Sequence, residues 1–103
     1  MKTFAVIRTR GGAYQDSVPL EGQREWVAHA RFMNDLHAKG AIVLGGPLEG
    51  TADVLLIMSA ETAEEAARYL QDDPWTSLNL LTIKEVSPWT LRLGALPDFP
   101  TER

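Results

Sequence analysis

The residue best suited to proton transfer is His29, which lies on the apolar face of an expected helix. At 3.6 residues per turn, Trp26, Met33 and Leu36 share this face, where a leucine or an alanine would be usual. Imidazole is the side chain that titrates nearest to neutral pH, so His29 could act as a general acid or base. A hydrogen-bonded core histidine with no catalytic role is the other interpretation, and the helix alone favours it.

A second candidate group is the acidic sequence Asp72-Asp73, which Pro74 and Trp75 follow. Pro74 predicts that the preceding helix ends near Gln71 or Asp72, because proline disfavours helical backbone in the residue before it. Two carboxylates at a helix C-terminus meet the negative end of the helix dipole, so their placement hints at a functional task. Asp and Pro are also frequent turn residues, and a simple turn is the interpretation that the motif alone favours.

Two further segments contain residues suited to binding a ligand. Gly45-Gly46-Pro47 is predicted to be a turn whose glycines let backbone amides approach a bound group, although it lacks the spacing and the lysine of a phosphate loop. Arg8, Arg10 and Tyr14 occur near the expected end of the first strand. They could line a pocket and attract an anion, and a solvated strand end explains them equally well.

Metal and redox chemistry find little support in the composition. The chain has two histidines and no cysteine. Eight helical residues separate His29 from His37, which is about 12 Å along the axis and too far for both to bind one ion. His37 lies near the expected helix end, where a histidine helps to cap the last carbonyls, so we interpret it as structural. We therefore expect no metal and no cofactor.

Charge and hydropathy exclude several classes of protein. Ten Lys and Arg residues against 14 Asp and Glu give a net charge of −4, and no basic run occurs, so nucleic acid is not an expected partner. The longest apolar run, Val54 to Met58, is much shorter than the roughly 20 residues that a membrane helix needs. No targeting segment is visible at the N-terminus, and the lack of cysteine favours a cytoplasmic protein.

The elements that must position these residues follow the order strand, helix, strand, strand, helix, strand. Thr62 and Glu65 form a capping box at the start of the second helix. We expect strands over residues 3–9, 41–44, 52–59 and 80–86, and helices over about residues 21–39 and 62–72. This order is typical of the ferredoxin-like α+β fold, a four-stranded antiparallel sheet with both helices on one face. The chain is predicted to form one domain over residues 1–103, with a core over about residues 3–89 and a C-terminal tail over residues 90–103.

The strands are apolar on both faces, although two helices can cover only one face of the sheet. The segments Phe4 to Ile7, Ala41 to Leu44 and Val54 to Met58 show no alternation with polar residues. The simplest cover is a second copy of the chain, so we predict a homodimer formed through the open sheet face. The alternative cover is the tail from Leu91 to Phe99.

Several short motifs occur in an order that resembles a known family. They are His29 in the first helix, Gly46-Pro47 after the second strand, Asp73-Pro74-Trp75 after the second helix and Ser87-Pro88-Trp89 after the last strand. Together they resemble the YCII-related family from about Phe4 to Trp89. The resemblance implies a dimeric α/β barrel of ferredoxin-like topology. Most relatives have no known function, and a few degrade aromatic compounds, among them a dehydrochlorinase.

The resemblance also implies a site. The family pairs the helix histidine with the aspartate of the Asp-Pro motif, and these correspond here to His29 and Asp73. A carboxylate that accepts one imidazole N–H fixes the tautomer and makes the other nitrogen more basic. We therefore expect metal-free proton transfer, by elimination or isomerisation, on a small cyclic or aromatic substrate. The alternative is a non-catalytic homodimer that binds a small molecule or serves in assembly.

The residues expected to contact the substrate surround this pair: Arg10, Trp26, Gly46, Pro47, Pro74 and Trp75. The tryptophans, together with Trp89, could form a flat apolar wall, and Gly46 could donate an amide to an oxyanion. The chain departs from the family in two places. Trp26-Val27-Ala28 stands where many members have an Arg-Pro pair before the histidine, and Trp75 stands where Tyr or Phe is usual. Both changes fall beside the expected pocket, so the substrate can differ from that of any relative.

Overall fold

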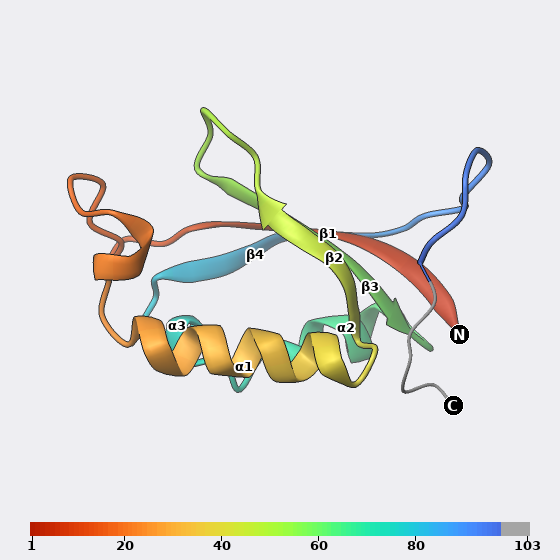
Figure 1. Cartoon of the computed structure of the whole chain (residues 1–103), viewed down its shortest axis with the longest axis horizontal. Helices are drawn as coiled ribbons and strands as arrows, with labels where there is room; N and C mark the ends of the chain where they lie inside the picture. Colours follow the sequence, from red (N-terminus) through yellow and green to blue (C-terminus); the bar gives the residue numbers. More distant parts are fainter. Residues whose placement is uncertain (98–103) are drawn as a thin grey trace.

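β1 (Lys2–Arg10) is the central strand of the architecture, and its side chains alternate between the two faces of a sheet. In the computed structural model, which describes residues 1–97, β1 pairs antiparallel with β3 (Asp53–Ala60) and with β4 (Leu81–Pro88). β2 (Ile42–Pro47) pairs with the outer side of β3, which gives the strand order β2-β3-β1-β4 (Figure 1). The sheet is open, and its topology confirms the expected ferredoxin-like α+β fold.

The helices α1, α2 and α3 lie on one face of this sheet (Figure 1). The described helices are the 3-10 helix η1 (Leu20–Gly22), α1 (Trp26–Ala38), α2 (Ala63–Tyr69) and the short α3 (Pro74–Ser77). Phe4 and Val6 of β1 point toward them and form the apolar core with Leu56 and Met58 of β3 and Leu36 of α1. None of these helices has both the length and the apolar character needed to cross a bilayer.

α1 begins later than the sequence predicts. Helical backbone is expected for residues 21–25, but Glu25 has a left-handed conformation with φ of 56°, which separates α1 from η1. The side chain of Gln23 explains the break, because its amide nitrogen and oxygen both bond to the backbone of Gln15 and hold this segment as a loop. The predicted stop is present, since Gly40 follows α1 with a φ of 88°.

The sequence does not predict α3, and this helix changes the environment of the acidic motif. Thr62 caps α2 as expected by accepting the N–H of Glu65 at 3.0 Å, but α2 ends well before the motif. Asp73 then caps α3, because its side chain accepts the N–H of Trp75 at 2.9 Å and Pro74 begins the helix. The prediction that Asp73 lies at a helix C-terminus is therefore wrong. It lies at a helix N-terminus, where its charge is favourable.

β2 and β4 are longer than predicted. The expected turn at Gly45-Gly46-Pro47 is instead the end of β2, and residues 48–52 connect it to β3. β2 is an edge strand, which is the position in a sheet where proline is tolerated. β4 likewise includes Ser87 and Pro88, although the sequence predicts its end at Val86.

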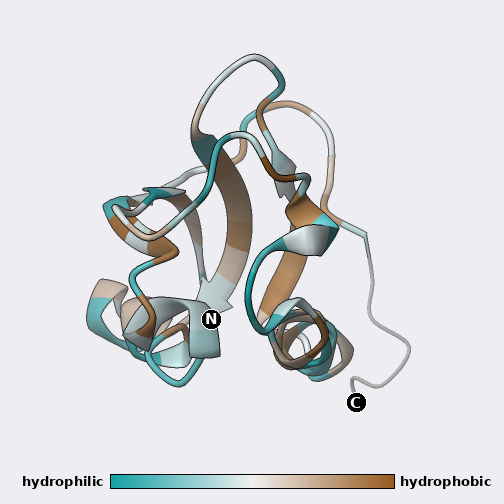
Figure 2. Ribbon diagram, turned by 90° about the vertical axis from the view of Figure 1, so that its left-hand side faces the viewer, coloured by the Kyte–Doolittle hydropathy of each residue, from teal (hydrophilic) through white to brown (hydrophobic). Residues whose placement is uncertain are grey.

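The sheet face opposite the helices is apolar. The register of β1 with β3 places four side chains on it: Ala5, Ile7, Leu55 and Ile57. Figure 2 shows the apolar character of the strands, and within residues 1–97 no helix packs on this face. Residues 90–97 lie at one end of the sheet, near the N-terminus (Figure 1). Phe99 and the rest of the tail lie outside the described residues.

Candidate functional site

A cavity of about 540 Å³ lies between α1 and the sheet. Helix α1 contributes Trp26, His29 and Met33 to its wall, and β1 contributes Arg8 and Arg10. The other walls come from β2, β3, the loop between these two strands and the connection from β1 to α1, with Trp75 of α3 and Leu81 of β4. A cavity of this volume is large enough for a small organic molecule.

His29 lies on the wall of this cavity and bonds to Asp73. Its Nδ1 is 2.9 Å from each of the two carboxylate oxygens. An ionised carboxylate can only accept hydrogen bonds, so Nδ1 carries the proton and donates it. This tautomer leaves the lone pair on Nε2, at the opposite edge of the ring, where no described residue bonds to it. The structure thus brings together the two residues that the family resemblance pairs.

Asp73 accepts hydrogen bonds from three groups. Besides His29, these are Nη1 of Arg8 at 2.8 Å and the backbone N–H of Trp75 at 2.9 Å. Burial raises the pKa of Asp73, which is 1% exposed, but the hydrogen bonds from the three donors outweigh burial and hold its pKa below the ordinary value for aspartate. Asp73 is therefore an anion at neutral pH, and its three donors fix the orientation of its carboxylate.

Arg8 is the buried cation that balances the charge of Asp73. Its Nη2 donates to the hydroxyl of Thr76 at 2.9 Å, and this hydroxyl donates in turn to the carbonyl of Leu70 at 2.7 Å. Among the described residues, Nε of Arg8 has no hydrogen-bond partner. The pairing of β1 with β4 shifts its register between Ile7 and Arg8.

Two tryptophans hold the imidazole in place. The ring of His29 stacks on Trp75 with 3.9 Å between the centroids and 3° between the planes, and Trp26 packs 5.9 Å from both rings. Trp75 is fully buried, and its indole N–H donates to the carbonyl of Arg24 at 2.5 Å. Tyr14 meets Trp75 edge-on at 6.3 Å. These contacts set the direction of Nε2 before any ligand binds.

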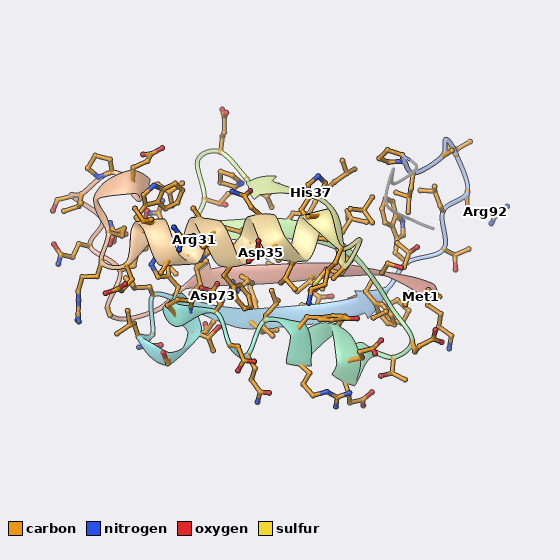
Figure 3. The ribbon with its side chains drawn as sticks, turned by 60° about the horizontal axis from the view of Figure 1, so that its bottom comes forward. Met1, Arg31, Asp35, His37, Asp73 and Arg92 are labelled. Atoms are coloured by element: carbon orange, nitrogen blue, oxygen red, sulfur yellow. The ribbon has the colours of Figure 1, made fainter. Side chains whose placement is uncertain are left out.

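Five of the predicted contact residues line the cavity: Arg10, Trp26, Gly46, Pro47 and Trp75. Pro74 does not, because it forms the first turn of α3. Trp89 also lies outside the lining, just beyond β4, and is 41% exposed. Figure 3 shows Asp73 beside the first half of α1 and His37 toward its other end. There Nδ1 of His37 lies 2.8 Å from the carbonyl of Ile42 in β2.

Sequence reasoning misses the ion pair between Arg8 and Asp73. The signal for it is the period-2 pattern of β1, in which Phe4 and Val6 face the core and Arg8 takes the next inward position. A cation at an inward position needs a buried partner. Only the tertiary structure identifies that partner, because 65 residues separate the two side chains.

The groups around His29 determine which chemistry the site can support. In the part of the chain that the structure describes, no three His, Cys, Asp or Glu side chains gather where they could hold a metal ion. The groups around His29 are a carboxylate already bound to a guanidinium, and aromatic rings. This arrangement can take up a proton at Nε2 and stabilise the resulting imidazolium.

Comparisons with known proteins agree with the fold and identify the family. No curated protein matches the chain. Among solved structures, it is similar to 5-chloro-2-hydroxyhydroquinone dehydrochlorinase (TftG) from Burkholderia phenoliruptrix AC1100, solved in complex with 2,5-dihydroxybenzoquinone. The TM-score is 0.60 at 23% sequence identity, over 89% of this chain and 95% of that chain, a likeness that supports the fold. The YCII-related domain matches residues 1–90, and the chain therefore belongs to the YCII-related domain family.

Proposed function

We propose that this protein is an enzyme in which His29 and Asp73 transfer a proton on a small cyclic or aromatic substrate. The observation that carries this proposal is the hydrogen bond from Nδ1 of His29 to a buried carboxylate, which leaves Nε2 as the basic nitrogen on the wall of a cavity. A base is effective when it is fixed within reach of the proton that it removes. The aromatic wall and the volume of the cavity suit a flat, compact substrate.

The reaction begins when Nε2 of His29 removes an acidic proton from the bound ring. An N–H bond forms as the O–H bond of a ring hydroxyl, or a C–H bond next to a ring carbonyl, breaks, and the electron pair of that bond stays on the substrate as an enolate. In an elimination, this pair forms a double bond while the leaving group departs as an anion, and Nε2 later releases its proton to water. In an isomerisation, Nε2 returns the proton at another carbon. Asp73 stabilises the imidazolium in both cases.

The solved neighbour supports this class of chemistry. It is a dehydrochlorinase, and its ligand is a six-membered quinone. Loss of hydrogen chloride from such a ring requires a base and a departing chloride, and His29 would supply the base here. Trp26 and Trp75, where this chain departs from the family pattern, lie beside the imidazole of His29. The ring that fits this cavity can therefore differ from the ligand of the solved neighbour.

The experiment uses 5-chloro-2-hydroxyhydroquinone as the first substrate and follows the release of chloride. His29→Gln keeps a polar side chain but cannot take up a proton, so we expect its rate to fall about 10²- to 10⁴-fold. The rate of Asp73→Asn should also fall, because asparagine no longer favours the tautomer of His29 that has its proton on Nδ1. Asp72→Asn, at the exposed neighbouring position, is the matched control. Full activity in His29→Gln on a verified substrate would reject the mechanism, and ring binding without turnover supports the non-catalytic alternative.

We also propose that the protein is a homodimer formed through the open sheet face. The apolar side chains there are those of Ala5, Ile7, Leu55 and Ile57, and Leu44 at the sheet edge is 51% exposed. Sedimentation should give the mass of two chains. Leu55→Lys should give the mass of one folded chain, because it places a charge in the interface. A wild-type protein with the mass of one chain would rule out this arrangement.

A further inference from the structure

Three charged side chains border the cavity besides His29, the proposed base. They are Arg8, Arg10 and Asp53. Asp73 balances the charge of Arg8 at 2.8 Å within the core. Lys84 balances that of Asp53 at 3.0 Å. Arg10 differs from both, because its partner belongs to a solvent-exposed loop.

The ion pair of Arg10 is weak and open to exchange. Its Nη1 lies 3.1 Å from an oxygen of Asp16, and the two side chains are 39% and 81% exposed. Exposed pairs of this kind contribute little to stability, because water screens the charges and solvates both groups well. Another anion that reaches Arg10 from the cavity can therefore replace Asp16 at a small cost.

Arg10 also stands at one end of a row of planar groups that leads to His29. Its guanidinium lies 4.4 Å from the ring centroid of Tyr14, in a cation–π contact. Tyr14 meets Trp75 at 6.3 Å, and Trp75 stacks on His29 at 3.9 Å. All four side chains line the cavity. The wall of one cavity therefore contains both the guanidinium of Arg10 and the imidazole of His29, linked by a series of ring contacts.

We propose that Arg10 binds an anionic oxygen on the ring of the substrate and that Asp16 is the internal competitor which the substrate displaces. This proposal rests on the proposed function of His29 for the position of the reacting atom. What it adds is the substrate class, a planar ring with a carboxylate or an ionised hydroxyl group. The planar fork of arginine matches the oxygens of such an anion and forms charge-assisted hydrogen bonds with them. The exchange breaks the ion pair between Arg10 and Asp16 and leaves the backbone hydrogen bonds of Gly11 and Ala13 in place.

Benzoate and benzamide test this proposal, because they have nearly the same shape and differ in charge. Their affinities are measured on the full chain from tryptophan fluorescence, since Trp26 and Trp75 lie on the cavity wall. We expect the wild type to bind benzoate about 10-fold more tightly than benzamide, and Arg10→Gln to lose this preference. Arg31→Gln is the matched control, because Arg31 is an exposed residue of α1 outside the cavity lining, and it should keep the preference (Figure 3).

Asp16→Asn should change the affinity for benzoate in the direction opposite to that expected if the ion pair only supported the loop. Removal of a competitor should tighten benzoate binding about threefold and leave benzamide binding unchanged. Weaker binding of both ligands would instead show that Asp16 only supports the loop, and would overturn the exchange.

The same ligands distinguish this inference from the proposed function. A benzoate preference that persists in His29→Gln and disappears in Arg10→Gln supports the anion site, even if no substrate is turned over. Equal affinities of the wild type for both ligands, or a preference that survives Arg10→Gln, overturns the anion site and leaves the role of His29 standing.

Discussion

The inner face of β1 is apolar in one half and charged in the other, although both halves follow the same alternation. Phe4 and Val6 pack against Met58 in the apolar core. The next two inward positions are Arg8, which is buried, and Arg10, which borders the cavity. One strand therefore supports an apolar core at one end and the candidate site at the other.

Burial contributes differently to the folding free energy of the two halves of this face. An apolar side chain gains free energy in proportion to the surface that it removes from water. A buried ion pair gains little, because the cost of desolvating both charges offsets most of their attraction. The pair of Arg8 with Asp73 is therefore better explained by the fixed position that it imposes on His29 than by a net contribution to folding.

The largest expected effect comes from removing the anion of the charged half. Asp73→Ala leaves Arg8 buried without a counterion and removes the cap of α3, so we expect the free energy of unfolding to fall by about 4 kcal/mol. Urea denaturation followed by circular dichroism measures this loss. Asp72→Ala at the exposed neighbouring position should change stability by less than about 0.5 kcal/mol. If the two variants were equally stable, the ion pair would not constrain the fold.

Removing a large side chain from the apolar half should destabilise the protein slightly less and leave its preference between ligands unchanged. Met58 is fully buried, and we expect Met58→Ala to lower the free energy of unfolding by about 3 kcal/mol. Its preference for benzoate over benzamide should equal that of the wild type, because the core lies apart from Arg10. Val27→Ala, at an exposed position of α1, is the control for stability. A changed ligand preference in Met58→Ala would show that the two halves are coupled.

The order of the elements could be predicted because local patterns encode it. The apolar run of β1, the capping box at Thr62 and the stop at Gly40 each depend on neighbours within a few residues. The ends of elements are harder to predict where proline occurs. Proline can end one element or begin the next, and packing decides which, so Pro47 lies within an edge strand while Pro74 begins a helix.

In the candidate site, too, some features could be predicted from the sequence and others could not. His29 stands out from sequence because it interrupts an apolar helix face, and the family resemblance indicates Asp73 as its partner. Arg8 also interrupts an inward-facing pattern, but strand periodicity cannot say which carboxylate it meets across the fold. Local signals thus identify unusual residues, and long-range packing determines how they combine.

The smallest expected effect is a pH dependence of stability that only the charged half produces. Burial raises the pKa of Asp73, but the hydrogen bonds that Asp73 accepts lower this pKa by more than burial raises it. The pKa of Asp73 in the folded protein is therefore below its ordinary value. The stability that Asp73 contributes is fully present above its unfolded pKa of about 4. It is lost as the pH falls through the lower folded pKa, because protonation leaves Arg8 without its anion.

Urea denaturation at several values between about pH 6 and pH 2 tests this dependence. The free energy of unfolding should decline with acid in the wild type and decline less in Asp73→Asn, which has no carboxylate to protonate at this position. Asp53→Asn is the comparison, since hydrogen bonds from Lys84 and Thr9 lower the pKa of Asp53 outside the buried network. It should keep most of the wild-type decline. Identical acid profiles for wild type and Asp73→Asn would mean that the charged half owes its order to packing around Trp75 and not to the anion of Asp73.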